Sequence, residues 1–112
     1  MKTYKTTIKD VEWVFKLLTK SQYEALHGAD SSGITISTTS EVHYLKDDLS
    51  RQVVGHELFH AYCATCGVHS TNNLSGSDME EIGADICGFH LEDMVAKKRA
   101  IYKALAPKEK NE

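Results

Sequence analysis

The feature that most constrains this chain is a pair of histidines four residues apart, His56 and His60. They lie in a stretch without proline, residues 49–66, whose apolar residues predict a helix covered by other elements. On a helix, residues four apart are neighbours with Cβ atoms about 5–6 Å apart. The two imidazoles can therefore reach one zinc ion at about 2.0–2.1 Å each.

A glutamate, Glu57, directly follows the first histidine and completes the pattern His-Glu-x-x-His. On a helix it falls on the same side as His60, next to the coordination position that the histidines leave open. A carboxylate there can take a proton from a water bound to the metal. A core helix with two incidental histidines is the alternative. It is disfavoured because burying two imidazoles and a carboxylate without partners is costly.

Two histidines do not complete a zinc site, because hydrolytic sites use three protein ligands and one open position. The preferred third ligand is Glu81, which lies on the opening turn of a second predicted helix. Asp85, one turn later, can accept a hydrogen bond from a ligand histidine and fix its ring. Four other side chains stay open as the third ligand: Glu80, His69, Asp85 and Cys66.

Length and charge limit the classes of protein that this chain can belong to. The 112 residues fit one domain, expected over residues 1–106, with a charged tail at 107–112. A net charge of −3 does not indicate a nucleic-acid partner. No apolar run is long enough for a membrane span, and the N-terminus lacks the apolar core of a signal peptide. Three cysteines, an odd number, favour a reducing, cytoplasmic setting.

The N-terminal third predicts two strands and a short helix. Residues 3–8 and 11–17 are expected strands around a turn at Lys9-Asp10, and the second alternates aromatic and β-branched residues. A helix over 10–19 is the competing interpretation. The spacing Ser21-x-x-Glu24 predicts a capping box for a helix that ends at Gly28.

The rest of the chain predicts a hairpin and two long helices. Strands at 34–37 and 42–45 should pair antiparallel. Polar residues at 47–50 favour the start of the histidine helix, which should run to about Cys66. After a loop at 68–76, the second helix should begin at Ser77 or Asp78 and run to about Ala104. We therefore expect an α+β fold, with a small, mostly antiparallel sheet packed on two long helices.

The second long helix carries two apolar stripes. The first is expected to face the core and contains Ile82, Ile86 and Phe89. The second either packs on the N-terminal strands or joins two copies of the chain in a homodimer; its members are Ala84, Leu91, Val95 and Tyr102. Among the cysteines, Cys63 and Cys66 are expected to be small buried residues rather than a redox pair, and Cys87 is expected in the core.

Together, His56-Glu57-Leu58-Phe59-His60 and Glu81-Ile82-Gly83-Ala84-Asp85 resemble the gluzincin pattern of thermolysin-type zinc peptidases. There, His-Glu-x-x-His is followed some twenty residues later by Glu-x-x-x-Asp. The resemblance implies that His56, His60 and Glu81 bind zinc, that Glu57 is the general base and that Asp85 supports a ligand histidine.

The order of elements from about Ile34 to Leu91 is similar to small ImmA/IrrE-type and phage-encoded zinc-peptidase domains. A departure is Phe59, which stands where the ImmA/IrrE type commonly has glycine. The resemblance implies a zincin-like fold and an endopeptidase whose substrate is a peptide or protein held along a strand of the hairpin. The donor to the oxyanion stays open among four residues: Tyr44, Tyr62, His69 and His90.

Two other functions are compatible with the same residues. The first is a zinc-stabilised module of the regulatory or anti-repressor type, which would bind a partner protein without catalysis. The second is a purely structural zinc site. Such sites are usually closed by four ligands and are rich in cysteine, so Glu57 would have no role in one.

Overall fold

A four-stranded sheet forms the frame of the molecule. The structure is a computed structural model and describes residues 1–66 and 76–107. Its strands are β1 (Lys2–Ile8), β2 (Val11–Leu18), β3 (Gly33–Ile36) and β4 (Glu41–Leu45). They lie in the order β1-β2-β4-β3. All four strands predicted from the sequence are confirmed, each within two residues of the expected bounds.

The sheet is mixed rather than simply antiparallel. β1 pairs with β2, and β3 pairs with β4, in the expected antiparallel sense. The central pairing of β2 with β4 is parallel. Alternation within a strand shows which side chains share a face, but not which strand lies beside it. The parallel pairing therefore could not be inferred from the sequence.

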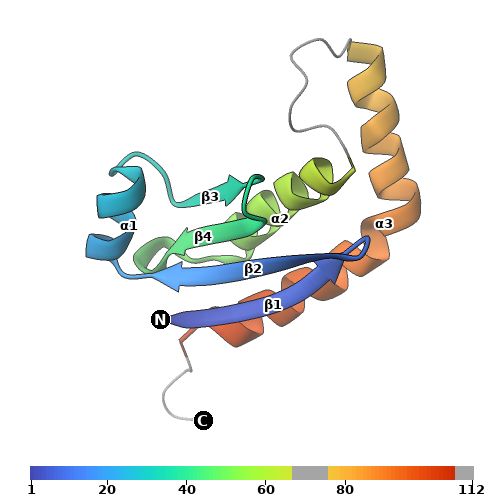
Figure 1. Cartoon of the computed structure of the whole chain (residues 1–112). Coiled ribbons are helices and arrows are strands. Elements are labelled where there is room, and N and C mark those ends of the chain that lie inside the picture. The colour runs from blue at the N-terminus through green and yellow to red at the C-terminus, as the bar shows by residue number, and fades with distance from the viewer. Residues whose placement is uncertain (67–75, 108–112) are drawn as a thin grey trace.

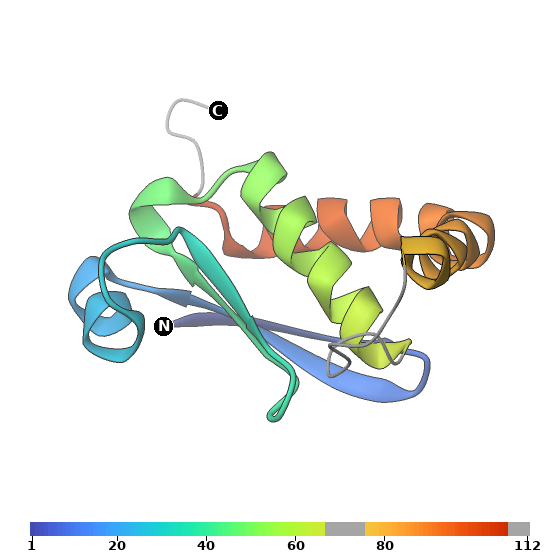
Figure 2. The same cartoon turned by 90° about the horizontal axis from the view of Figure 1, so that it is seen from above.

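Both long helices cover one face of the sheet, and the short helix lies at its end (Figures 1 and 2). These are α2 (Arg51–Thr65), α3 (Gly76–Leu105) and α1 (Lys20–His27). The main core lies between the sheet and the long helices and includes Phe15, Tyr44, Leu58 and Ile101, all fully buried. This is the α+β arrangement expected from the sequence.

The alternation of buried and more exposed side chains in β2 explains why this segment is a strand and not a helix. Trp13, Phe15 and Leu17 are buried in the main core. Leu18 instead joins Tyr23 of α1 in a second, smaller cluster. The strand thus buries apolar side chains on both of its faces. The alternative interpretation of residues 10–19 as a helix is therefore wrong.

The start of α1 differs from its prediction. The N-cap is Thr19, whose side chain accepts a hydrogen bond from the Gln22 backbone, while the Gln22 side chain accepts one from the Thr19 backbone. The predicted box at Ser21-x-x-Glu24 is therefore wrong by two residues. Glutamine serves in a capping box as glutamate does, and Thr19 has the extended backbone that an N-cap needs. The end at Gly28, with φ of 80°, is confirmed.

The histidine helix α2 begins one residue after Ser50, whose side chain accepts a hydrogen bond from the Val53 backbone. A short 3₁₀ turn, η1 (Lys46–Asp48), precedes it. Val54, Leu58 and Ala61 recur on one face and are fully buried. Their burial sets the rotation of α2 about its axis and hence the directions of the histidines.

The other long helix, α3, begins at Gly76, and its first half extends beyond the sheet (Figure 1). The prediction of Phe89 as a core residue is wrong, because its side chain is 80% exposed. Cys87, also expected in the core, is exposed. In this half only Ile86 is buried among residues 80–92. The predicted loop lies outside the described residues except for Gly76, which is helical.

Within the described part of the chain, no helix combines the length and the apolar character that crossing a membrane requires.

The turn between β1 and β2 generates a prediction for stability. Lys9 and Asp10 form a two-residue hairpin loop with positive φ at both positions, 48° and 68°. Such loops favour Asn-Gly, because other residues are strained in the left-handed region. The double variant Lys9→Asn, Asp10→Gly should raise the free energy of unfolding by about 1 kcal/mol in urea denaturation. Gly28→Ala, at φ of 80°, should lower it. An unchanged or reduced midpoint for the double variant would contradict this account of the turn.

Candidate functional site

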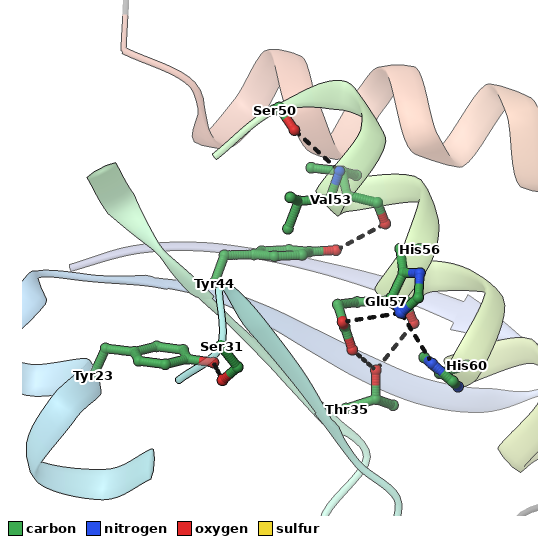
Figure 3. A network of polar contacts seen from close by, with 10 residues as sticks. Tyr23, Ser31, Thr35, Tyr44, Ser50, Val53, His56, Glu57 and His60 are labelled. Atoms are coloured by element: carbon green, nitrogen blue, oxygen red, sulfur yellow. Dashed lines mark hydrogen bonds and ion pairs between the residues drawn. The ribbon is translucent and has the colours of Figure 1, made fainter. Parts of the chain in front are cut away.

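The two histidines of α2 project from its exposed side and converge. The Nε2 atoms of His56 and His60 lie 3.3 Å apart (Figure 3), and both side chains are exposed. Two nitrogen ligands at tetrahedral angles around a zinc ion, each bonded at 2.0–2.1 Å, are separated by about 3.3 Å. The pair therefore fits the spacing that zinc requires.

Glu57 belongs to α2, and its side chain contacts the edge strand β3. Its side chain is largely buried, and one carboxylate oxygen, Oε2, is 3.8 Å from His56 Nε2. The other, Oε1, accepts a hydrogen bond of 2.7 Å from Thr35 Oγ1 (Figure 3). Gly33 leaves room for this arrangement, because a Cβ there would lie 2.9 Å from Glu57 Cγ. The structure thus places a buried carboxylate beside two converging, exposed imidazoles.

A depression gives access to this carboxylate from solvent. Its volume is about 280 Å³, and it lies between β3 and the first turns of α2. The lining residues are Ser31, Ser32, Gly33, Val53, His56 and Glu57. A small polar group that enters it meets His56 and Glu57 together.

The carboxylates expected from α3 do not join this group. Glu81 and Asp85 are both exposed, as is the alternative Glu80. Among the side chains that the structure describes, no three histidines, cysteines, aspartates or glutamates cluster in a way that could hold a metal. Cys66 is half-buried at the end of α2, and His69 lies outside the described residues. The structure thus brings together His56, Glu57 and His60, and the third ligand stays a prediction.

Two of the four oxyanion donors suggested by the sequence already have partners. The Tyr44 hydroxyl donates to the Val54 carbonyl at 3.2 Å, and the Tyr62 hydroxyl donates to Asp93 on α3. Burial raises the pKa of both tyrosines above their usual range; the charge of Glu57 adds to it at Tyr44, and the Asp93 hydrogen bond and charge add to it at Tyr62. Both hydroxyls therefore stay protonated and serve the fold.

The other two suggested donors are the histidines. His90 is half-buried beside the Tyr62 ring, with the ring centroids 5.6 Å apart, and His69 is not among the described residues.

Strand β3 contributes to the site although the sequence-based prediction did not include it. Gly33 and Thr35 hold Glu57, although neither belongs to the histidine motif. A signal was present: in a strand, Gly33 and Thr35 share the face opposite to Ile34 and Ile36. A small residue and a hydroxyl on one face of an edge strand indicate a close polar contact there.

A second polar cluster, also missed, lies on the other face of the sheet. His27 Nε2 is 2.8 Å from His43 Nδ1, and His43 Nε2 is 2.8 Å from a carboxylate oxygen of Glu41. Lys16 is 3.2 Å from the same oxygen. The hydrogen bond from His43 lowers the pKa of Glu41, and burial, then the charge of His43, lowers the pKa of His27. This cluster joins α1 to the sheet.

Comparison with known proteins adds no assignment, since no protein-family model, curated protein or solved structure matches the chain.

The second cluster predicts how stability depends on pH. Because the pKa of His27 is lower in the folded state than its ordinary value, the unfolded chain binds more protons near that value. Stability should therefore fall as the pH drops from about 7.5 to about 5.5. His27→Gln should lose less stability over this interval than the wild type, as measured by urea denaturation at both pH values. Leu26→Gln, at an exposed neighbouring position, serves as the control and should follow the wild type. An equal loss in all three proteins would contradict the role of His27.

Proposed function

We propose that this chain is a zinc-dependent endopeptidase with a small zincin-like domain. The observation that carries the proposal is the 3.3 Å separation of the His56 and His60 Nε2 atoms beside the buried Glu57 carboxylate. A helix that was merely amphipathic would not need two exposed imidazoles aimed at one point. The resemblance to gluzincins agrees with this geometry and supplies the reaction class.

The proposed chemistry divides between the metal and the protein. When bound, zinc would supply a Lewis acid that lowers the pKa of water to about 7. Glu57 accepts the proton of the attacking water and passes it to the leaving amine. Thr35 holds Oε1 at 2.7 Å, which leaves Oε2, on the side of His56, for this proton transfer. The carboxylate is thus fixed before substrate arrives, which limits the reorganisation needed in the reaction.

Substrate would be an extended peptide segment. Strand β3 is an edge strand, pairing only with β4 in the described sheet, and it borders both Glu57 and the depression in front of it. An extended chain can add to such an edge through backbone hydrogen bonds. Addition along β3 would carry a peptide carbonyl past the histidine pair, which favours a peptidase over a hydrolase of small molecules.

Glu81 is our proposed third ligand, with Asp85 as the residue that orients a ligand histidine. The support comes from the resemblance, since both side chains are exposed in this structure. The first half of α3 is weakly anchored, because Ile86 is its one buried side chain among residues 80–92. Turning Glu81 towards α2 would therefore disturb little of the core.

Glutamine at position 57 tests catalysis separately from metal binding. Glu57→Gln should keep zinc and fold but lose about 10²–10⁴-fold in turnover, because the amide cannot accept the proton. The assay is cleavage of a dye-quenched unfolded protein by the zinc-loaded full chain, with zinc measured by mass spectrometry. Glu12→Gln, at an exposed position on β2, is the matched control. Zinc-loaded wild type that cleaves nothing, or a Glu57→Gln variant as active as wild type, would overturn the peptidase and favour the binding module.

Zinc affinity tests the ligand set. His56→Ala and His60→Ala should each abolish stoichiometric binding, and Glu81→Ala should weaken it more than Asp85→Asn, whose expected loss is about 10–100-fold. Competition with a chromogenic chelator gives the affinities. Glu80→Ala is the matched control, and loss of zinc in that variant instead would move the third ligand to Glu80. Full binding in the double variant lacking both histidines would remove the metal centre from this helix.

A further inference from the structure

One face of α3 is exposed between residues 84 and 95 and carries small and apolar side chains. The next residues along the same line, Lys98 and Tyr102, are half-buried beside α2. Ala84, Gly88, Leu91 and Val95 follow the 4-3-4 spacing of a coiled-coil seam and are all exposed. The exposed fractions of Leu91 and Val95 are 46% and 40%. We call these four residues the α3 seam. The buried residues of the helix, such as Ile86 and Ile101, lie elsewhere on its surface.

Charges flank the α3 seam with opposite signs at its two ends. Towards the N-terminus, Asp85 falls within about 60° of Gly88 around the helix; towards the C-terminus, Arg99 and Lys103 do so. All three are exposed. Arg51 of α2 extends the basic end, since its guanidinium lies over the Tyr102 ring, 4.9 Å from the centroid. Asp85 at one end and basic residues at the other therefore share one face, with the exposed carboxylate of Glu92 between them.

Gly88 in the middle of α3 has no explanation within one copy of the chain. Glycine inside a helix costs about 0.5–1 kcal/mol relative to alanine. A Cβ at Gly88 would meet nothing within 4 Å among the described residues. A depression of about 340 Å³ lies there, bordered by Phe89, Leu91 and Glu92. The absence of a side chain at Gly88 would let a second helix approach closely.

We propose that the α3 seam pairs with the same seam of a second copy of this chain, with the two helices antiparallel. The arrangement is self-complementary, as a two-fold dimer requires. A pairing centred near residue 92 sets Asp85 opposite Arg99 of the second copy, twice, and Gly88 opposite Val95. It also brings the two Glu92 side chains together once, so two opposite-charge contacts stand against one like-charge contact. A parallel pairing would place acidic against acidic and basic against basic, which opposes association. Charge complementarity within one face selects a second copy over an unrelated partner.

This dimer can be tested without zinc. It uses neither histidine, although Asp85 also has a proposed role at the zinc site and Glu81 lies on the same face of α3. Its measurement is the oligomeric state of the metal-free full chain, so failure of the peptidase and failure of the dimer are separate results.

Sedimentation velocity over a range of concentrations tests the seam. The wild type should form a dimer, and Leu91→Glu should raise its dissociation constant about tenfold or more, because a charge would be buried at the centre of the pairing. Leu26→Glu, at a more exposed leucine on α1, is the matched control and should dimerise as the wild type does. Circular dichroism checks that each variant is folded. A wild type that stays monomeric at every concentration, or a dimer that Leu91→Glu leaves unchanged, would overturn the proposal.

Charge reversal tests the antiparallel direction. Asp85→Arg alone and Arg99→Asp alone should each weaken self-association, since each places like charges opposite each other twice. An equimolar mixture of the two variants should form a heterodimer, because both contacts then join opposite charges. Association of the mixture no stronger than that of either variant alone would reject the antiparallel pairing.

Discussion

The burial of one face of α2 against the sheet is the constraint on which the candidate site depends. Val54, Leu58 and Ala61 occupy that face and have no exposed surface. At 100° per residue, Glu57 falls at the border of the buried face, whereas His56 falls nearly opposite to it. The same packing therefore exposes the imidazoles and directs the carboxylate against β3. At about 1.5–3 kcal/mol for each large apolar side chain, this burial outweighs the cost of placing one carboxylate beside a hydroxyl.

The local sequence pattern was sufficient to predict an element wherever its structure depends mainly on its own residues. Alternation in β2 and the apolar spacing in α2 predicted both elements, because each needs only a periodic face to bury. The capping box of α1 was misplaced because two overlapping polar sequences qualify, and only the backbone at Thr19 separates them. The parallel pairing of β2 with β4 depends on the path of the chain through α1 and β3, which connect the two strands. The residues of β2 and β4 themselves do not indicate which strand each will pair with.

The candidate site divides in the same way. His56, Glu57 and His60 were predictable because they lie on one helix with fixed geometry. Thr35 was not, because its contact with Glu57 depends on how close β3 comes to α2. Whether the proposed ligand Glu81 could reach the histidine pair depends on the rotation of α3 relative to α2. Few buried side chains fix that rotation in the first half of α3. The apolar spacing that predicted Phe89 in the core assumed that this half is covered by other elements, and it is not.

The two proposals meet at Glu81. In this structure it is exposed and, on the helix wheel, falls on the same face as the α3 seam. A side chain directed towards a second copy is not directed towards His56 and His60. If Glu81 is the zinc ligand, metal binding and dimerisation therefore draw on one residue in two orientations, and by linkage each weakens the other by the same factor. Glu80 lies about 100° from Glu81 but equally near the centre of the α3 seam, on its other side, so the same competition would apply if Glu80 were the ligand.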